Sequence, residues 1–198
     1  MEHHVNLVHN IPFFSVFFAM FCGIITPLLK SGRAARHLHG FMVGLVGMLS
    51  VVLLANVVKN QEAYTFMMGH FPAPWGNELR IGPLEALLAV MVSVVMFLTI
   101  TAGSRQIFEE IVPEKQKFYF IMLNATYGAM LAMTYTNDMF TGYVFIEILP
   151  IASCTLILAR GTKQAIVGTT HYLVFGCMGS GLLLLGVCIL YGITGQLL

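Results

Sequence analysis

The chain has 198 residues, of which 58% are hydrophobic and only 10% are charged. Soluble domains carry about 25% charged residues, so this composition excludes an ordinary soluble domain and indicates a polytopic membrane protein. The formal net charge is +1, and such a balance offers no basic surface for nucleic acid. The four cysteines lie in apolar runs without metal-ligand spacing, and the chain has no glycine-rich phosphate loop. We therefore expect no metal, no cofactor and no catalytic chemistry in this chain.

Six apolar runs are long enough to cross a bilayer, whose core of about 30 Å requires about 20 helical residues. They cover residues 11–29, 40–58, 84–102, 118–135, 139–159 and 166–191. This pattern predicts an all-α polytopic membrane helix bundle, a single transmembrane domain with six transmembrane helices. The loop 60–82 contains Gly69-His-Phe-Pro-Ala-Pro-Trp-Gly76, and its prolines and glycines favour a hairpin or an extended excursion on the outer face.

Basic residues predict the orientation of these helices. Eight of the ten Lys and Arg residues follow the first, third and fifth apolar runs, namely Lys30, Arg33, Arg36, Arg105, Lys115, Lys117, Arg160 and Lys163. The positive-inside rule assigns these loops to the cytoplasm. An even number of helices then places both termini on the outer side. The N-terminus lacks the positive segment of a cleaved signal peptide, so the first run is expected to be a retained helix.

Glu147 is the most informative residue, because it lies in an apolar run with no Lys or Arg within ten positions on either side. A carboxylate at bilayer depth costs roughly 2.5–3.5 kcal/mol on insertion scales. Such a group is retained where it is hydrated, paired or protonated, which makes Glu147 a candidate for a proton or ion pathway. The alternative is a protonated glutamate that is hydrogen-bonded inside a helix bundle.

Other polar features surround this acid in the last two runs. Pro150 removes a backbone hydrogen bond and frees the carbonyl of Ile146 for water or an acid, or it simply kinks the helix. His171 lies about five residues into the last run and is either a proton relay or a packed, hydrogen-bonded histidine. Its depth differs from that of Glu147 by on the order of 10 Å, which suits a relay through water. Hydroxyl groups that could line this relay belong to Ser153, Thr169 and Thr170.

The remaining polar residues have simpler interpretations. Glu85 lies at the outer surface of the third run, where a carboxylate is inexpensive. Asn124 and Thr126 in the fourth run are expected to form packing hydrogen bonds. Gly176 and Ser180 are four residues apart in the last run, a pair of small residues that lets another helix backbone approach closely.

Three segments resemble one known family. They are Asn137-Asp-Met-Phe-Thr-Gly-Tyr-Val-Phe-Ile-Glu-Ile-Leu-Pro-Ile-Ala-Ser-Cys154, the outer segment Phe71–Leu87, and His171–Gly181 with the closing Leu190-Tyr-Gly-Ile-Thr-Gly195. In this order they are similar to helix five, the hairpin before helix three, and helix six of antiporter-like, proton-translocating membrane subunits. Such subunits occur in respiratory complex I, in Mrp-type cation/proton antiporters and in membrane-bound hydrogenases.

The resemblance implies a conduit for protons or sodium ions that is coupled to a redox or antiport partner. The key acid of the family corresponds to Glu147 and pairs in the family with a lysine on helix seven. His171 stands where helix six often carries a lysine. The family's acid at the start of helix three falls on Gly82, so it is absent here.

The resemblance covers only the N-terminal six helices of a family with about fourteen helices and two inverted repeats. It implies a split or truncated subunit in a multi-subunit redox-driven pump or Mrp-type antiporter of a prokaryotic cell membrane. A separate chain would supply helix seven onward with its intramembrane lysine, and other subunits would carry any oxidoreductase activity. The alternatives are a structural membrane subunit without transport of its own and a small oligomeric carrier. The expected partners are other membrane subunits and the lipid bilayer, not nucleic acid.

Overall fold

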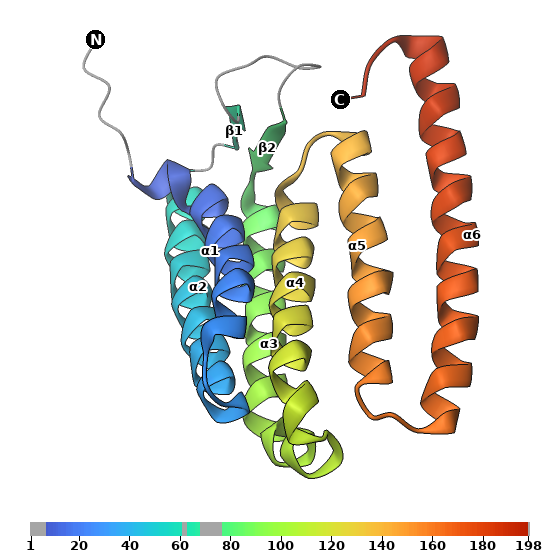
Figure 1. Ribbon diagram of the computed structural model, residues 1–198. Helices are drawn as coiled ribbons and strands as arrows, with labels where there is room; N and C mark the ends of the chain where they lie inside the picture. The colour runs from blue at the N-terminus through green and yellow to red at the C-terminus, as the bar shows by residue number, and fades with distance from the viewer. Residues whose placement is uncertain (1–6, 61–62, 68–76, 198) are drawn as a thin grey trace.

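The computed structural model describes residues 7–60, 63–67 and 77–197. In this part of the chain six α-helices run up and down beside one another, as Figure 1 shows. Their bounds are α1 (Ile11–Ile25), α2 (Gly32–Asn60), α3 (Pro83–Glu110), α4 (Pro113–Tyr135), α5 (Met139–Leu158) and α6 (Lys163–Thr194). The all-α membrane bundle predicted from the sequence is confirmed.

The helices form a compact group, α1–α4, to which α5 and α6 are added at one edge (Figure 1). Helix α4 is central, because it packs against α1, α3 and α5 and also contacts α2. Its side chains Phe120, Tyr127 and Tyr135 are fully buried in the core. Helix α6, by contrast, packs mainly against α5, and most of its apolar side chains are exposed. Exposed apolar surface of this kind is what a lipid environment or another membrane helix covers.

Five of the six helices are long and apolar enough to cross a membrane, and α4 is the one that falls short. At 23 residues, α4 has the length to cross but carries polar residues, including Asn124 and Tyr127, along its buried face. Helices that surround it on several sides can satisfy these groups, so α4 does not need a lipid-compatible surface all round. The predicted number of six transmembrane helices is therefore approximate.

The helices also extend beyond the predicted apolar runs. Helix α2 begins at Gly32 rather than near residue 40, and α3 continues to Glu110, where Arg105 forms an ion pair of 2.8 Å with Glu109 one turn later. Charged residues end an apolar run without ending a helix, because their side chains can reach water. Helix α1 ends early, at Ile25, in a 3₁₀ turn over Thr26–Leu28 that contains a proline.

Contacts between the connecting turns bring the three basic loops together at one end of the bundle. The Lys117 ammonium donates to the carbonyl of Leu29 over 3.3 Å and joins α4 to the turn between α1 and α2. Arg160, after α5, pairs with Glu110 at the end of α3 over 3.0 Å. We call this end of the bundle the basic end. The packing is thus consistent with the prediction that the loops after the first, third and fifth apolar runs lie on the same side of the membrane.

A two-stranded hairpin covers the opposite end. Strands β1 (Tyr64–Met67) and β2 (Glu78–Ile81) pair antiparallel, within the loop 60–82 whose turn residues favoured a hairpin. Burial raises the pKa of Tyr64 to about 12. After β2, the backbone N–H of Gly82 donates to Glu85 Oε2 over 2.9 Å, so Glu85 closes the first turn of α3. Residues 68–76, including Trp75, lie outside the described residues.

A buried polar network ties α1, α2 and α4 together near the basic end. The side chain of Asn124 forms a hydrogen bond with His39 Nδ1 through Oδ1, and its amide donates to Thr26 Oγ1 over 3.2 Å. Thr26 in turn donates to the carbonyl of Cys22 over 2.6 Å. Asn124 thus forms the packing hydrogen bonds expected from the sequence. Its partner His39 was not singled out by any sequence pattern.

Replacing Asn124 by leucine should destabilise the fold, because it leaves His39 buried without a partner and removes one of the two hydrogen bonds of the Thr26 hydroxyl. We expect a loss of roughly 1–3 kcal/mol in the free energy of unfolding, measured by denaturant titration in mixed micelles. Thr126→Val is the matched control, since the one hydrogen bond of the Thr126 side chain among the described residues is to the carbonyl of Met122 in its own helix. Equal stability of the Asn124 and Thr126 variants would contradict this role of the network.

Candidate functional site

Helix α5, which carries the candidate acid, is anchored at its start by Asp138. The Asp138 carboxylate accepts hydrogen bonds from the backbone N–H of Phe140 at 3.0 Å and of Thr141 at 3.3 Å. The backbone N–H of Asn137, the residue before Asp138, donates to the carbonyl of Glu78 in β2 over 2.9 Å. The hairpin and the cap together define where α5 begins, and therefore how deep in the bundle each of its side chains lies.

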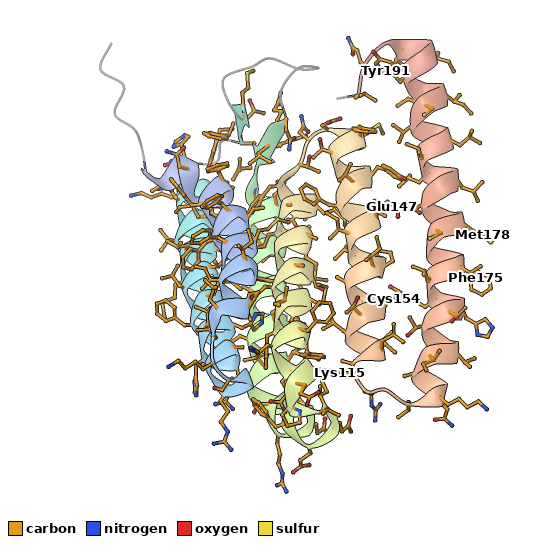
Figure 2. The ribbon with its side chains drawn as sticks, viewed as in Figure 1. Lys115, Glu147, Cys154, Phe175, Met178 and Tyr191 are labelled. Carbon is orange, nitrogen blue, oxygen red and sulfur yellow. The ribbon has the colours of Figure 1, made fainter. Side chains whose placement is uncertain are left out.

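One stripe of α5 faces α6. A Cβ built on Gly176 of α6 would lie 3.4 Å from Cβ of Pro150, and Cys154 Sγ lies 3.9 Å from the carbonyl oxygen of Thr169. Glu147 is three residues before Pro150 and seven before Cys154, so helical spacing places it on the same stripe. Figure 2 shows Glu147 and Cys154 in the space between the two helices. We call this contact the α5–α6 seam.

Glu147 is half-buried in the seam and lies about 12 Å from the start of α5, near the middle of the helix. Tyr143, one turn earlier, donates its hydroxyl to Glu147 Oε1 over 3.0 Å. The ion pairs within the described residues are Arg105–Glu109 and Arg160–Glu110, so Glu147 has no basic partner there. Its carboxylate is thus held by one hydrogen-bond donor in an apolar setting, where it can accept a proton or pair with a cation.

Pro150 contributes to the seam by packing. Helix α5 continues through Pro150 to Leu158. The ring of Pro150 lies against the backbone of Gly176, and a larger side chain at position 176 would press on it. The small residue therefore sets how closely the two helices approach beside Glu147, in agreement with the close approach expected from Gly176 and Ser180.

The structure does not bring His171 to Glu147. Thr169, Gly176 and Ser180 lie on the side of α6 that packs on α5, and helical spacing puts His171 nearly opposite them. His171 is exposed. Because Pro150 is level with Gly176, the offset between Glu147 and His171 along the helix axes is about 12 Å, close to the value expected from the sequence.

The three candidate hydroxyl groups differ in their surroundings. Thr169 is buried in the seam, and its hydroxyl has no hydrogen-bond partner within the part of the chain that the structure describes. Ser153 is half-buried on α5. Thr170 is exposed and donates to the carbonyl of Ile166 in its own helix. Thr169 is therefore the hydroxyl best placed to contact water or an ion inside the seam.

One residue of the seam was not singled out in the sequence, and a second was predicted only as part of a close-packing pair. Tyr143 carries the hydrogen bond to Glu147, and the spacing of four residues on one helix was the available signal. Ser180 is buried on the facing side of α6, and its hydroxyl donates to the carbonyl of Cys177 over 3.2 Å. Within residues 7–60, 63–67 and 77–197, no cluster of three His, Cys, Asp or Glu residues is arranged to hold a metal ion.

Comparison with known proteins identifies the family of this chain. A family model described as NADH:quinone oxidoreductase/Mrp antiporter, TM matches residues 136–198, which contain α5 and α6. The NADH-quinone oxidoreductase subunit N of Desulforudis audaxviator is 35% identical over 146 residues, covering 74% of this chain and 29% of that protein. A Na(+)/H(+) antiporter subunit of Alkalihalophilus pseudofirmus is 33% identical over 174 residues, covering 85% of this chain and 33% of that protein.

The chain belongs to the family of antiporter-like membrane subunits. Two solved structures share the fold. The membrane-bound sulfane sulfur reductase, an archaeal respiratory membrane complex, matches with a TM-score of 0.81 and 24% identity over 96% of this chain and 38% of that chain. The Mrp complex from Dietzia sp. matches with a TM-score of 0.84 and 17% identity over 97% of this chain and 36% of that chain. This antiporter-like subunit spans about a third of the length of the curated relatives that it matches.

Widening position 176 should open the seam. In Gly176→Leu the Cβ would already be in van der Waals contact with Pro150 at 3.4 Å, and we expect the atoms beyond it to push α5 and α6 apart. The measurement is a disulfide between Cys154 and an introduced Thr169→Cys, with the other three cysteines replaced by alanine. We expect the bond to form readily when Gly176 is retained and poorly in the Gly176→Leu variant. Gly179→Leu is the matched control, because a Cβ there meets nothing within 4 Å, and equal bond formation in both variants would contradict the packing.

Proposed function

We propose that this antiporter-like subunit forms part of a path for protons or sodium ions through the membrane, with Glu147 as the group that gains and loses a proton. The observation that carries the proposal is the position of its carboxylate. It is half-buried near the middle of α5, receives one hydrogen bond from Tyr143, and has no basic partner among the described residues. A carboxylate retained at such a cost is expected to serve an ion pathway.

The proposed mechanism is electrostatic coupling between Glu147 and a lysine on the family's helix seven. An ionised Glu147 stabilises the protonated lysine, and loss of the lysine proton favours proton uptake by Glu147. The seam provides a second acceptor and donor in Thr169, while Gly176 lets α6 pack closely on Pro150 of α5. The chain supplies the acid and its surroundings, and the redox or antiport reaction that drives the ion belongs to other subunits.

The other pathway candidates have separate places in this proposal. Ser153 and Thr169 lie in or beside the seam, and would contact water there. His171 and Thr170 are exposed on α6 and would act on the surface that another membrane segment covers. Proton exchange between His171 and Glu147 then passes around α6 through water, over an axial distance of about 12 Å.

The subunit is an integral membrane protein, and we propose that its basic end faces the cytoplasm of a prokaryotic cell. The clustering of the three basic loops at one end supports this orientation under the positive-inside rule. Both termini then lie on the outer side. An impermeant thiol reagent should label a cysteine introduced at Lys163 only after the membrane has been permeabilised.

Glu147→Gln should abolish ion movement coupled to the driving reaction in the assembled membrane complex. The amide preserves the shape of the side chain but cannot titrate. Proton transport is measured by quenching of a pH-sensitive dye in inverted membrane vesicles, with subunit assembly followed in the same preparation. We expect transport to fall to background, and Glu147→Asp to restore part of it.

Glu114→Gln is the matched control, because Glu114 is an exposed carboxylate at the basic end, and its loss should leave transport unchanged. Normal transport with Glu147→Gln in a fully assembled complex would contradict the proposal. That outcome would favour the alternative of a structural membrane subunit in which Glu147 is neutral and packed.

We further propose that other membrane subunits assemble with this chain, and that helix seven onward, with its lysine, is supplied by a separate chain that packs against α5 and α6. The exposed apolar surface of α6 supports this docking. Phe175 and Met178 are 71% and 62% exposed, and Figure 2 shows both pointing away from α5. Glu147 is accessible from the open side of the seam, where Cys177 is also exposed next to Gly176.

A short thiol-to-amine cross-linker attached to Cys177 should capture the lysine that pairs with Glu147. Cys177 is nearly level with Pro150, whereas Cys188 lies about 16 Å further along α6 and provides the matched control. We expect mass spectrometry of the Cys188→Ser protein to identify an intramembrane lysine, and the Cys177→Ser protein to yield none. A product between two chains identifies a separate subunit, and a product within one chain identifies a continuous one. Reaction with lipid amines alone would argue against a lysine near Glu147.

A further inference from the structure

A long groove runs between α2 and α3, on a side of the bundle that is separate from the α5–α6 seam. Its apolar part has a volume of about 570 Å³. On α2 it is lined by Gly44, Gly47 and Val51, and on α3 by Val94 and Phe97. Gly44 leaves the floor of the groove open, because a Cβ there would come no closer than 3.9 Å to Phe97. At Gly47 a Cβ would lie 3.3 Å from Cβ of Ser93, so this glycine lets α2 approach α3 closely. The groove is thus wide enough for a linear apolar ligand.

The groove continues into a polar hollow at the basic end. This second hollow, of about 330 Å³, shares Phe97 with the apolar groove and is lined by Arg36, His37, Thr101 and Ser104, among others. Arg36 is half-buried, and neither ion pair found within the described residues involves it. The polar hollow at the end of the apolar groove is thus lined by the basic residues Arg36 and His37 and by two residues with hydroxyl groups.

The apolar part of the groove is about as long as one leaflet of a bilayer core is deep. It is lined on α2 from Val43 to Val52, and nine helical residues rise about 14 Å. Half of a bilayer core of about 30 Å has nearly this depth. The polar hollow thus lies at the level of lipid headgroups, and the apolar part lies at the level of acyl chains.

We propose that this groove is a binding site for an anionic phospholipid. Arg36 and His37 contact the phosphate, Thr101 and Ser104 add hydroxyl hydrogen bonds, and one acyl chain lies along Gly44 and Gly47. Basic pockets between transmembrane helices at the cytoplasmic side are suited to anionic headgroups. A guanidinium binds phosphate with two parallel hydrogen bonds, which adds geometric selectivity. An apolar partner helix in the same groove would leave Arg36 without an anion.

The test is a lipid titration followed by native mass spectrometry. The protein is purified in detergent with the subunits it retains, delipidated, and titrated with dioleoyl phosphatidylglycerol or dioleoyl phosphatidylcholine. We expect phosphatidylglycerol to bind at least about fivefold more tightly, as expected for a basic side chain beside an anionic headgroup. The double variant R36Q/H37Q should reduce phosphatidylglycerol binding to the level of phosphatidylcholine, while Arg36→Lys should retain most of the preference.

Two further variants separate the headgroup from the acyl chain. Gly44→Leu fills the apolar groove without a backbone clash and should weaken both lipids. Lys163→Gln removes the same charge from the start of α6, outside the groove, and should change neither affinity. Equal binding of the two lipids, or an unchanged preference in R36Q/H37Q, would overturn the proposal. Displacement of the lipid by millimolar inorganic phosphate would identify a site for a free anion and would also overturn it.

Discussion

Every polar side chain in a membrane-spanning bundle needs a hydrogen-bond partner, and this requirement organises the structure. In the compact part formed by α1–α4 many polar groups are paired across helices, although Ser15 Oγ and His39 Nε2 are buried there without a partner among the described residues. Asn124 joins His39 and Thr26 across three helices, and the hydroxyl groups of Ser93 and Tyr127 lie 2.8 Å apart. These interactions explain how α4 can be the least apolar helix and still lie at the centre of the bundle.

For Glu147 the need for hydrogen-bond partners is met much less fully. Its partner is a single tyrosine hydroxyl, and the seam around it is formed by only two helices. Close packing at Gly176 limits how much water can enter from α6, while the open side of the seam leaves the carboxylate half-buried. A group in this state responds strongly to any nearby charge, because the surrounding medium screens little. That sensitivity is the physical basis for coupling Glu147 to a second titratable group.

The two sides of the molecule therefore suit different neighbours. The α5–α6 side exposes apolar residues together with a titratable acid and an accessible cysteine, features suited to contact with another membrane helix. The α2–α3 side has a glycine-floored groove that ends in basic and hydroxyl groups, features suited to lipid. Helix α4, which contacts α2 and α3 on one side and α5 on the other, lies between these two surfaces.

The amino-acid sequence alone determined the membrane class and the approximate positions of the apolar helices, and it singled out Glu147 as a candidate site residue, because hydropathy and an isolated charge in an apolar run are local properties. It also indicated Gly176 and Ser180 as a close-packing pair. Only the tertiary structure decided that Tyr143 holds Glu147, that His39 is buried against Asn124, and that His171 lies on the far side of α6. The rotation of each helix about its axis depends on which neighbours pack against it, and in a helix that is apolar on all faces the sequence does not encode that rotation.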